Sequence, residues 1–251
     1  MGAVGKLQIV GIGPGDARNM TASCRDSLQG ADVIAGYKGY TDLLKPLFPD
    51  KRFYETGMTQ EVERCRTAIN LARDGKKVCL VSGGDSGVYG IACLVCELAE
   101  ESPDLEIEII PGVTAAVGGA ALLGAPLGAD FAVVSLSDLL TPWGIIEKRL
   151  RAAASGDFAI CLYNPGSKKR TGHLRAACDI LLELLPPDRL CGITRNIGRK
   201  GQSVLLTTLS QLRESQAGME ETIFIGNSGT REIKGRLVTP RGYGKDRVGY
   251  K

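Results

Sequence analysis

Two glycine-rich segments carry the residues best suited to holding a ligand, and each directly follows a run of apolar residues. The first reads VGIGPGD over residues 10–16, and the second reads SGGDSGVYG over residues 82–90. Glycines allow the backbone to approach a bound molecule closely, and an aspartate can pair with a cationic group. The simpler alternative is that these glycines only turn the chain from a strand into a helix.

The first segment departs from the common nucleotide-binding patterns. A dinucleotide fingerprint needs GxGxxG opening into a helix, with an acidic residue at the end of the second strand. Here Gly15 comes one position early, after Pro14, and Asp32 begins the second expected strand. No GK[ST] follows, so a Walker A loop is also excluded. We therefore expect a tight turn that is compatible with a ligand other than a nucleotide.

A metal centre is not expected. The chain has one histidine, His173, and a single CxxC formed by Cys93 and Cys96. A structural zinc site needs two further ligands at similar spacing, which are lacking. We interpret the CxxC as helix packing, and the eight cysteines as buried, reduced thiols of a cytoplasmic protein.

Charge and hydropathy exclude other classes. A net charge of +3 and an aromatic content of 5% are both lower than expected for a nucleic-acid-binding protein. The sequence contains no run of about eighteen apolar residues, so no membrane span is predicted. No secretory signal is expected from the first residues. The basic cluster at 167–175 is either a solvated surface or a clamp for an anionic ligand.

Strand and helix patterns alternate along nearly the whole chain. In the first half they predict a helix over 59–75, capped by Thr59 and ended by Gly75. Further helices are expected at 145–155 and 174–185. Strands are expected at 7–13, 31–36, 77–83, 105–112, 131–137, 157–164, 189–196, 202–208 and 221–228.

This order predicts an α/β protein of two lobes, each with a largely parallel or mixed central sheet flanked by helices. The seam falls in a run of small residues at 111–130, which gives lobes over 1–118 and 119–243 and a flexible tail over 244–251. Ligands of open α/β sheets bind outside the carboxyl ends of the strands, where both glycine segments are expected.

Five motifs together resemble the tetrapyrrole methyltransferase superfamily over about residues 6–241: GIGPGD, SGGDSGVYG, PGVTA, SLSDLLTPW and LYNPGSKKR. The last two are similar to the members that methylate carbon 17 of a corrin precursor in cobalamin biosynthesis. The resemblance implies methyl transfer from S-adenosylmethionine to precorrin-3B or cobalt-factor III, coupled to ring contraction. It also implies a homodimer with its active site in the cleft between the two lobes.

The resemblance assigns roles to particular residues. The implied cofactor contacts are Gly83, Gly84, Asp85, Val88, Thr114, Ala115, Tyr163, Asn164 and Thr194. The implied substrate contacts, including cations for the ring carboxylates, are Gly13, Pro14, Tyr37, Lys38, Tyr89, Lys168, Arg170 and Arg195. The candidates for the acid or base of ring contraction are Ser135, Asp138 and Asp16.

Several alternatives stay open at this point. Asp138 or Thr141 could simply cap a helix that starts near Pro142. Two residues depart from the superfamily pattern: Ser86 could loosen the cofactor turn, and Gly166 could alter the substrate rim. The chain could also methylate a different ring carbon, or bind a metabolite without catalysis.

Overall fold

The computed structural model describes residues 5–167 and 170–242. The chain divides into two compact units, Met1–Ala115 and Ala116–Lys251. The predicted tail over 244–251 lies outside the described residues. Among the described residues, no helix is long and apolar enough to cross a membrane.

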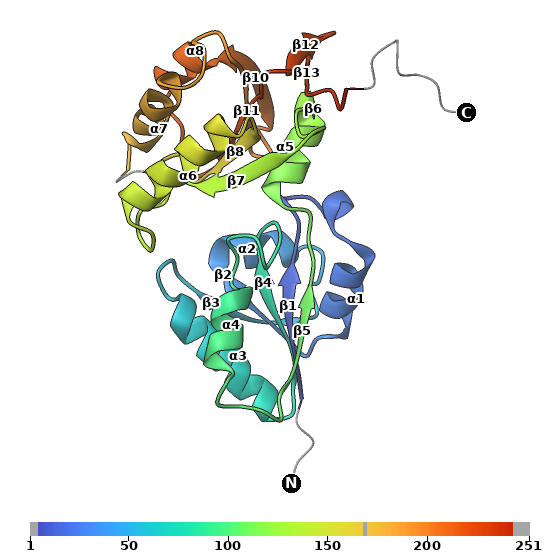
Figure 1. Cartoon of the computed structure of the whole chain (residues 1–251). Coiled ribbons are helices and arrows are strands. Elements are labelled where there is room, and N and C mark those ends of the chain that lie inside the picture. Colours follow the sequence, from blue (N-terminus) through green and yellow to red (C-terminus); the bar gives the residue numbers. More distant parts are fainter. Residues whose placement is uncertain (1–4, 168–169, 243–251) are drawn as a thin grey trace, which may run out of the picture. The chain divides into compact units, whose positions relative to one another are not determined.

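The first unit is a parallel sheet with helices on both faces (Figure 1). Its strand order is β3-β2-β4-β1-β5, and every pairing is parallel. The strands are β1 (Lys6–Gly11), β2 (Val33–Tyr37), β3 (Arg52–Thr56), β4 (Lys77–Ser82) and β5 (Glu106–Ile110). The helices are the 3₁₀ turn Ala17–Asn19, α1 (Ala22–Gly30), α2 (Lys38–Leu44), α3 (Glu61–Arg73) and α4 (Ala92–Leu98).

Alternation along β1 builds a core on each face of this sheet, because successive strand residues point to opposite sides. Leu7 and Ile9 belong to a buried cluster that includes residues of α3 and α4. Val10 belongs to a second cluster with Cys24 of α1 and Leu44 of α2. Burial on both faces explains why these strands read as nearly continuous apolar runs.

The second unit has a mixed sheet in the order β10-β9-β11-β8-β7. Only the β7–β8 pairing in this sheet is parallel. Its strands are β7 (Phe131–Ser135), β8 (Ala159–Tyr163), β9 (Leu190–Arg195), β10 (Ser203–Thr208) and β11 (Glu221–Ile225). Its helices are α5 (Ala115–Leu123), α6 (Trp143–Ser155), α7 (His173–Leu182) and α8 (Leu209–Arg213). A small sheet joins β6 (Gly124–Ala125), β12 (Arg231–Ile233) and β13 (Arg236–Val238).

Two local predictions are wrong. Thr59 does not cap α3: its φ is +65°, and the N-cap is Gln60, whose side chain instead accepts a hydrogen bond from the Gly57 amide at 2.7 Å. Cys93 and Cys96 do not pack inside the fold, because both are exposed on α4 while the other cysteines are buried.

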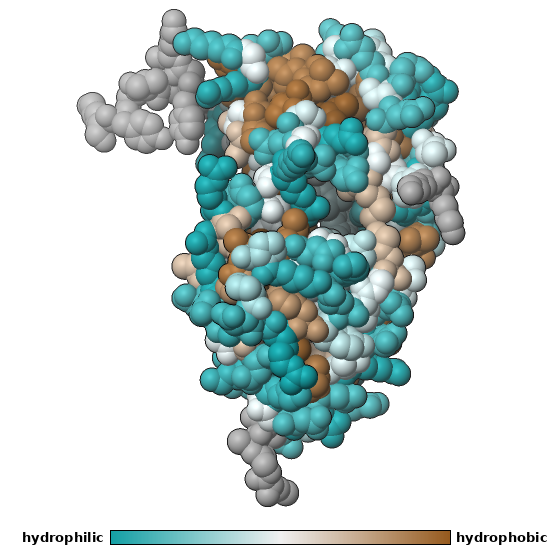
Figure 2. All heavy atoms as spheres, turned by 180° about the vertical axis from the view of Figure 1, so that it is seen from behind, coloured by the Kyte–Doolittle hydropathy of each residue, from teal (hydrophilic) through white to brown (hydrophobic). Residues whose placement is uncertain are grey.

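Apolar side chains on the surface gather in a patch on the second unit (Figure 2).

The predicted small-residue helix, α5, packs directly on the second sheet. A Cβ atom at Gly119 would lie 2.7 Å from the Thr194 hydroxyl oxygen and 2.8 Å from the Phe224 ring. Thr194 and Phe224 are both buried in the sheet. The absence of a side chain at Gly119 therefore sets how closely α5 approaches the sheet.

We expect Gly119→Ala to lower the free energy of unfolding by about 1–3 kcal/mol, because the added methyl overpacks this contact. Gly144→Ala is the matched control, since Gly144 lies in α6 with no atom near its Cβ position. The control should be neutral or stabilise by up to about 1 kcal/mol. Urea unfolding of both variants measures the difference, and equal stabilities would contradict close packing of α5.

Candidate functional site

The two glycine segments meet at the carboxyl ends of β1 and β4. Gly13 and Gly84 exchange backbone hydrogen bonds of 3.0 and 2.8 Å, and both residues have positive φ. The turn after β5 joins them: a Cβ atom at Gly112 would lie 2.1 Å from the Gly84 carbonyl oxygen and 2.6 Å from that of Gly11. Only glycine tolerates such backbone contact. The glycines therefore do more than turn the chain, because they let three loops touch.

Asp85 fastens these loops through backbone amides. Its Oδ1 accepts hydrogen bonds from the amides of Gly87 at 2.8 Å and Val88 at 3.1 Å. Its Oδ2 accepts one from the amide of Gly112 at 2.9 Å. The carboxylate thus organises the turn, whereas the resemblance had suggested a direct pairing with the cofactor.

Ser86 adds a second fastening point. Its side chain is fully buried, and its hydroxyl lies 3.4 Å from the carbonyl oxygens of both Ile9 and Ile110. The hydroxyl can donate to either carbonyl, one from β1 and one from β5. The serine at this position therefore ties the turn to the sheet, and the expectation that it loosens the turn is wrong.

The fastened turn lies close to the loop that follows β5. The three atoms nearest to a Cβ at Gly84 belong to the backbone of Val113, Thr114 and Ala115, at 3.6–3.9 Å, so three of the predicted cofactor residues lie together. Val88, whose amide donates to Asp85 in the same turn, is 37% exposed. Bare peptide groups and an accessible apolar side chain suit the amino-acid, ribose and base parts of S-adenosylmethionine.

The other predicted residues of the first unit have local partners. Asp16 caps the 3₁₀ turn by accepting a hydrogen bond from the Asn19 amide at 2.9 Å. Tyr37 packs edge-on against Tyr40, and Lys38 pairs with Asp42 at 3.1 Å. Three predicted substrate contacts differ in exposure: Gly13 and Pro14 are buried, whereas Tyr89 is 54% exposed with a φ of +50°.

In the second unit, residues at the ends of β7 and β8 interlock. Asn164, with a φ of +53°, donates from Nδ2 to the Ser135 hydroxyl at 2.9 Å. The Tyr163 hydroxyl accepts a hydrogen bond of 2.6 Å from the amide of Ala116, in the first turn of α5. Thr194 is fully buried, and its side chain packs in the sheet beneath α5.

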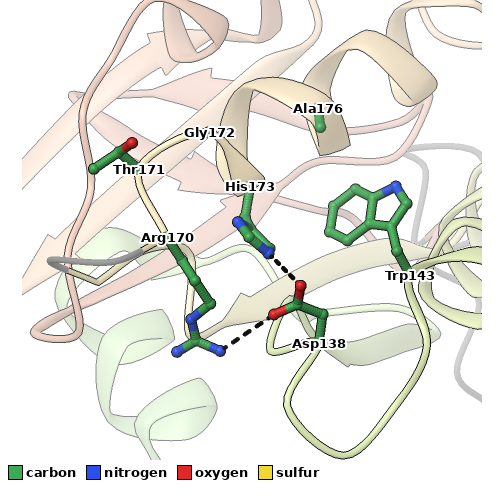
Figure 3. Close-up of a pocket in the computed structure, with 7 residues that line it drawn as sticks. All are labelled: Asp138, Trp143, Arg170, Thr171, Gly172, His173 and Ala176. Carbon is green, nitrogen blue, oxygen red and sulfur yellow. Dashed lines mark ion pairs between the residues drawn. The ribbon is translucent and has the colours of Figure 1, made fainter.

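A hollow of about 430 Å³ lies where α6 and α7 begin (Figure 3). Asp138, Arg170 and His173 converge in it, and Trp143 closes one side. The His173 Nε2 lies 3.1 Å from the Asp138 carboxylate, and an Arg170 guanidinium nitrogen lies 3.9 Å from it. His173 also packs edge-on against Trp143, with ring centroids 5.2 Å apart.

The electrostatics of the hollow follow from these pairings. The hydrogen bond with His173, with a smaller contribution from Arg170, holds the pKa of Asp138 below its ordinary value. Arg170 is itself held by the hydroxyls of Ser137 and Ser167. Neither Asp138 nor Thr141 caps α6, whose N-cap is Pro142 without a side-chain bond. The capping alternative is therefore wrong.

The sequence interpretation missed His173 and Trp143 as site residues. The available signal was that the one histidine of the chain falls inside the basic cluster at 167–175. Lys168, a predicted substrate contact, lies outside the described residues. Arg195, the last residue of β9, is paired at 3.3 Å with Glu221, the first residue of β11.

Gly166 replaces the larger residue of the superfamily pattern for a steric reason. A Cβ atom there would lie 2.1 Å from the carbonyl oxygen of Ala217, so the backbone leaves no room for a side chain. Within the described ranges, no group of three or more His, Cys, Asp or Glu side chains is placed to hold a metal ion.

Known proteins match this chain along most of its length. The family model of the Tetrapyrrole (Corrin/Porphyrin) Methylases matches residues 6–213. The chain is 46% identical over 238 residues to a probable cobalt-factor III C(17)-methyltransferase of Salmonella typhimurium, covering 94% of this chain and 99% of that protein. It is 39% identical to a precorrin-3B C(17)-methyltransferase of Sinorhizobium sp, covering 95% and 97%.

A solved structure agrees with these matches. The crystal structure of the methyltransferase CobJ is 36% identical, has a TM-score of 0.87, and is matched over 94% of this chain and 100% of that chain. Some relatives are longer than this chain, which spans 53% and 45% of two of them.

We expect Asp85→Ala to lower the free energy of unfolding by about 2 kcal/mol, because three amides lose a charged acceptor. The same variant should speed hydrogen exchange at the Gly112 amide. Asp104→Ala is the control, since Asp104 is an exposed aspartate of the same unit. Unfolding and exchange measured on both variants test this, and unchanged exchange at Gly112 in Asp85→Ala would show that Asp85 does not fasten the loops.

Proposed function

Because the chain belongs to the tetrapyrrole (corrin/porphyrin) methylases, we propose that it transfers a methyl group from S-adenosylmethionine to carbon 17 of a corrin precursor. The observation that carries this proposal is the near full-length similarity to two proteins named as C(17)-methyltransferases. The substrate is precorrin-3B or cobalt-factor III, and methylation is coupled to ring contraction. The solved methyltransferase with a TM-score of 0.87 supports the same activity.

The glycine turn of the first unit is the proposed cofactor site. When bound there, S-adenosylmethionine supplies a methyl group activated by its positively charged sulfur. Gly83 and Gly84 offer peptide groups, and Val88 offers an apolar contact. Thr114 and Ala115 line the next loop. Asp85 acts by keeping the turn in shape before the cofactor arrives, which limits the ordering cost of binding.

The residues at the ends of β7 and β8 hold their loop for the substrate and cofactor. Asn164 and Ser135 keep one another in place, and Tyr163 fixes the start of α5. Arg170 faces the hollow with a planar guanidinium that suits a carboxylate of the macrocycle. Lys38 and Arg195 are further cations for the remaining carboxylates, once they exchange their present acidic partners.

Of the three candidates predicted from the sequence, we retain Asp138 as a residue of the active site. The carboxylate of Asp16 is engaged in capping the 3₁₀ turn, and the hydroxyl of Ser135 is engaged with Asn164. Asp138 lies instead in a hollow with a titratable partner, His173. That arrangement is suited to proton transfer.

The proposal includes a cytoplasmic homodimer, as the resemblance implies. The apolar surface of the second unit is of the kind that subunit contacts bury (Figure 2). The exposed apolar side chains of this unit include Val204 and Leu205 on the edge strand β10.

We expect S-adenosylhomocysteine to bind with micromolar affinity and Val88→Glu to weaken it at least tenfold, about 1.4 kcal/mol. A carboxylate at position 88 would repel the carboxylate of the ligand and would replace an apolar contact with a charged group. Val62→Glu places the same change on the exposed face of α3 and should leave the affinity unchanged. Isothermal titration measures the affinity of the wild type and of both variants, and NADH serves as the control ligand that should not bind.

Methyl transfer is tested with the same proteins and labelled S-adenosylmethionine. Turnover with precorrin-3B or cobalt-factor III is the expected result. Binding without turnover on either substrate would favour a metabolite-binding protein, and turnover at a different ring carbon would favour another member of the family. Equal affinity in Val88→Glu and Val62→Glu would place the cofactor away from the glycine turn.

A further inference from the structure

The chain's one histidine is held from two sides in the hollow of the second unit. His173 is the first residue of α7, Trp143 is the first residue of α6, and Asp138 lies in the segment that leads into α6. Figure 3 shows His173 and Arg170 both directed at the Asp138 carboxylate, with the Trp143 ring beside the imidazole. The His173 side chain is 19% exposed, so it is oriented by its neighbours yet open to a ligand.

The bond to Asp138 decides which nitrogen of the imidazole carries the proton. Nε2 lies 3.1 Å from Asp138 Oδ2, and an ionised carboxylate only accepts hydrogen bonds. The neutral ring therefore carries its hydrogen on Nε2 and keeps a lone pair on Nδ1. Among the described residues, no other hydrogen bond or ion pair engages the ring, so Nδ1 is left available to accept a proton.

Charged groups face His173 from more than one element. The Asp138 carboxylate lies against its Nε2, and the start of α7 carries the partial positive charge of a helix N-terminus. Arg170 is the remaining charged group that lines the hollow. On the adjoining helices, Glu147 is paired with Arg151 and Arg175 with Glu214, so these charges are engaged elsewhere.

Methylation of a ring carbon releases a proton that such a base can accept. The new C–C bond uses an electron pair of the ring, and the C–S bond breaks with its pair left on sulfur, which becomes a neutral thioether. The positive charge passes to the ring, which returns to neutrality by releasing one proton. A positioned imidazole that accepts this proton typically accelerates such a step by about 10²–10⁴-fold.

We propose that His173 is the catalytic base that takes up this proton at Nδ1, and that Asp138 is the positioning residue that orients it. This inference rests on the proposed function. The imidazolium that forms is stabilised by Asp138, and the proton then passes to water. Trp143 packs edge-on against the imidazole and so restricts its rotation.

The first test needs no turnover. In untagged protein, the single histidine gives one set of imidazole signals, so NMR titration reports the pKa of His173 directly. Asp138→Asn removes the negative charge and should lower that pKa, and the Nε2 tautomer should lose its dominance. An unchanged pKa and tautomer in Asp138→Asn would overturn the role of Asp138.

The second test is single-turnover methyl transfer against pH. The wild-type rate should fall as the pH drops through the pKa found by NMR, because a protonated His173 cannot accept a further proton. In Asp138→Asn this acid limb should move to lower pH. His173→Gln should transfer methyl at least about 100-fold more slowly while binding S-adenosylhomocysteine normally. Arg175→Gln, a change on the same helix, should keep the wild-type rate.

The outcomes separate this inference from the function on which it rests. If the wild-type protein transfers no methyl group, both the proposed function and this inference are contradicted. If the wild type is active and His173→Gln matches its rate and pH profile, only the inference falls. A slow His173→Gln whose acid limb stays at the wild-type pH would mean that His173 has a structural role, and this result would also overturn the proposal.

Discussion

Direct backbone contact between three loops is the constraint on which the first unit depends. Gly11 ends β1, and Gly84 and Gly112 follow the neighbouring strands β4 and β5. A Cβ atom on either Gly11 or Gly112 would lie less than 3 Å from peptide atoms of the other loops. The contact brings polar peptide groups to one edge of a parallel sheet, where ligands of such sheets bind. Asp85 then holds that arrangement by accepting from amides on two of the loops.

The second unit solves a different problem with different means. Its sheet is mixed, and its chemistry lies where α6 and α7 begin. There Asp138 is the shared partner of Arg170 and His173, so one carboxylate orients both a cation suited to substrate carboxylates and a base. The two units thus divide the proposed work, with cofactor binding in the first and proton transfer in the second.

The sequence predicted the fold class and the positions of most strands, because strands buried on both faces leave unmistakable apolar runs. It missed β3, whose residues are half exposed, and the short strands β6, β12 and β13, which are two or three residues long. The glycine spacing also indicated the two glycine segments, and motif resemblance indicated Asp138.

What the sequence could not provide was pairing in space. The role of Asp85 depends on the Gly112 amide, 27 residues away, and that of Asp138 depends on His173 from another helix. Ser86 and Gly166 read as departures from a pattern, yet each fits its surroundings, one by bonding to strand carbonyls and the other by leaving room for the Ala217 carbonyl. Such contacts between distant segments carry no local signature.

The most direct measurement is the position of the transferred methyl group. Protein supplied with precorrin-3B or cobalt-factor III and S-adenosylmethionine carrying a ¹³C-methyl group should yield a ring-contracted product. NMR correlations in that product should join the labelled methyl to carbon 17. A label at any other ring carbon, or recovery of both substrates unchanged, would contradict the account.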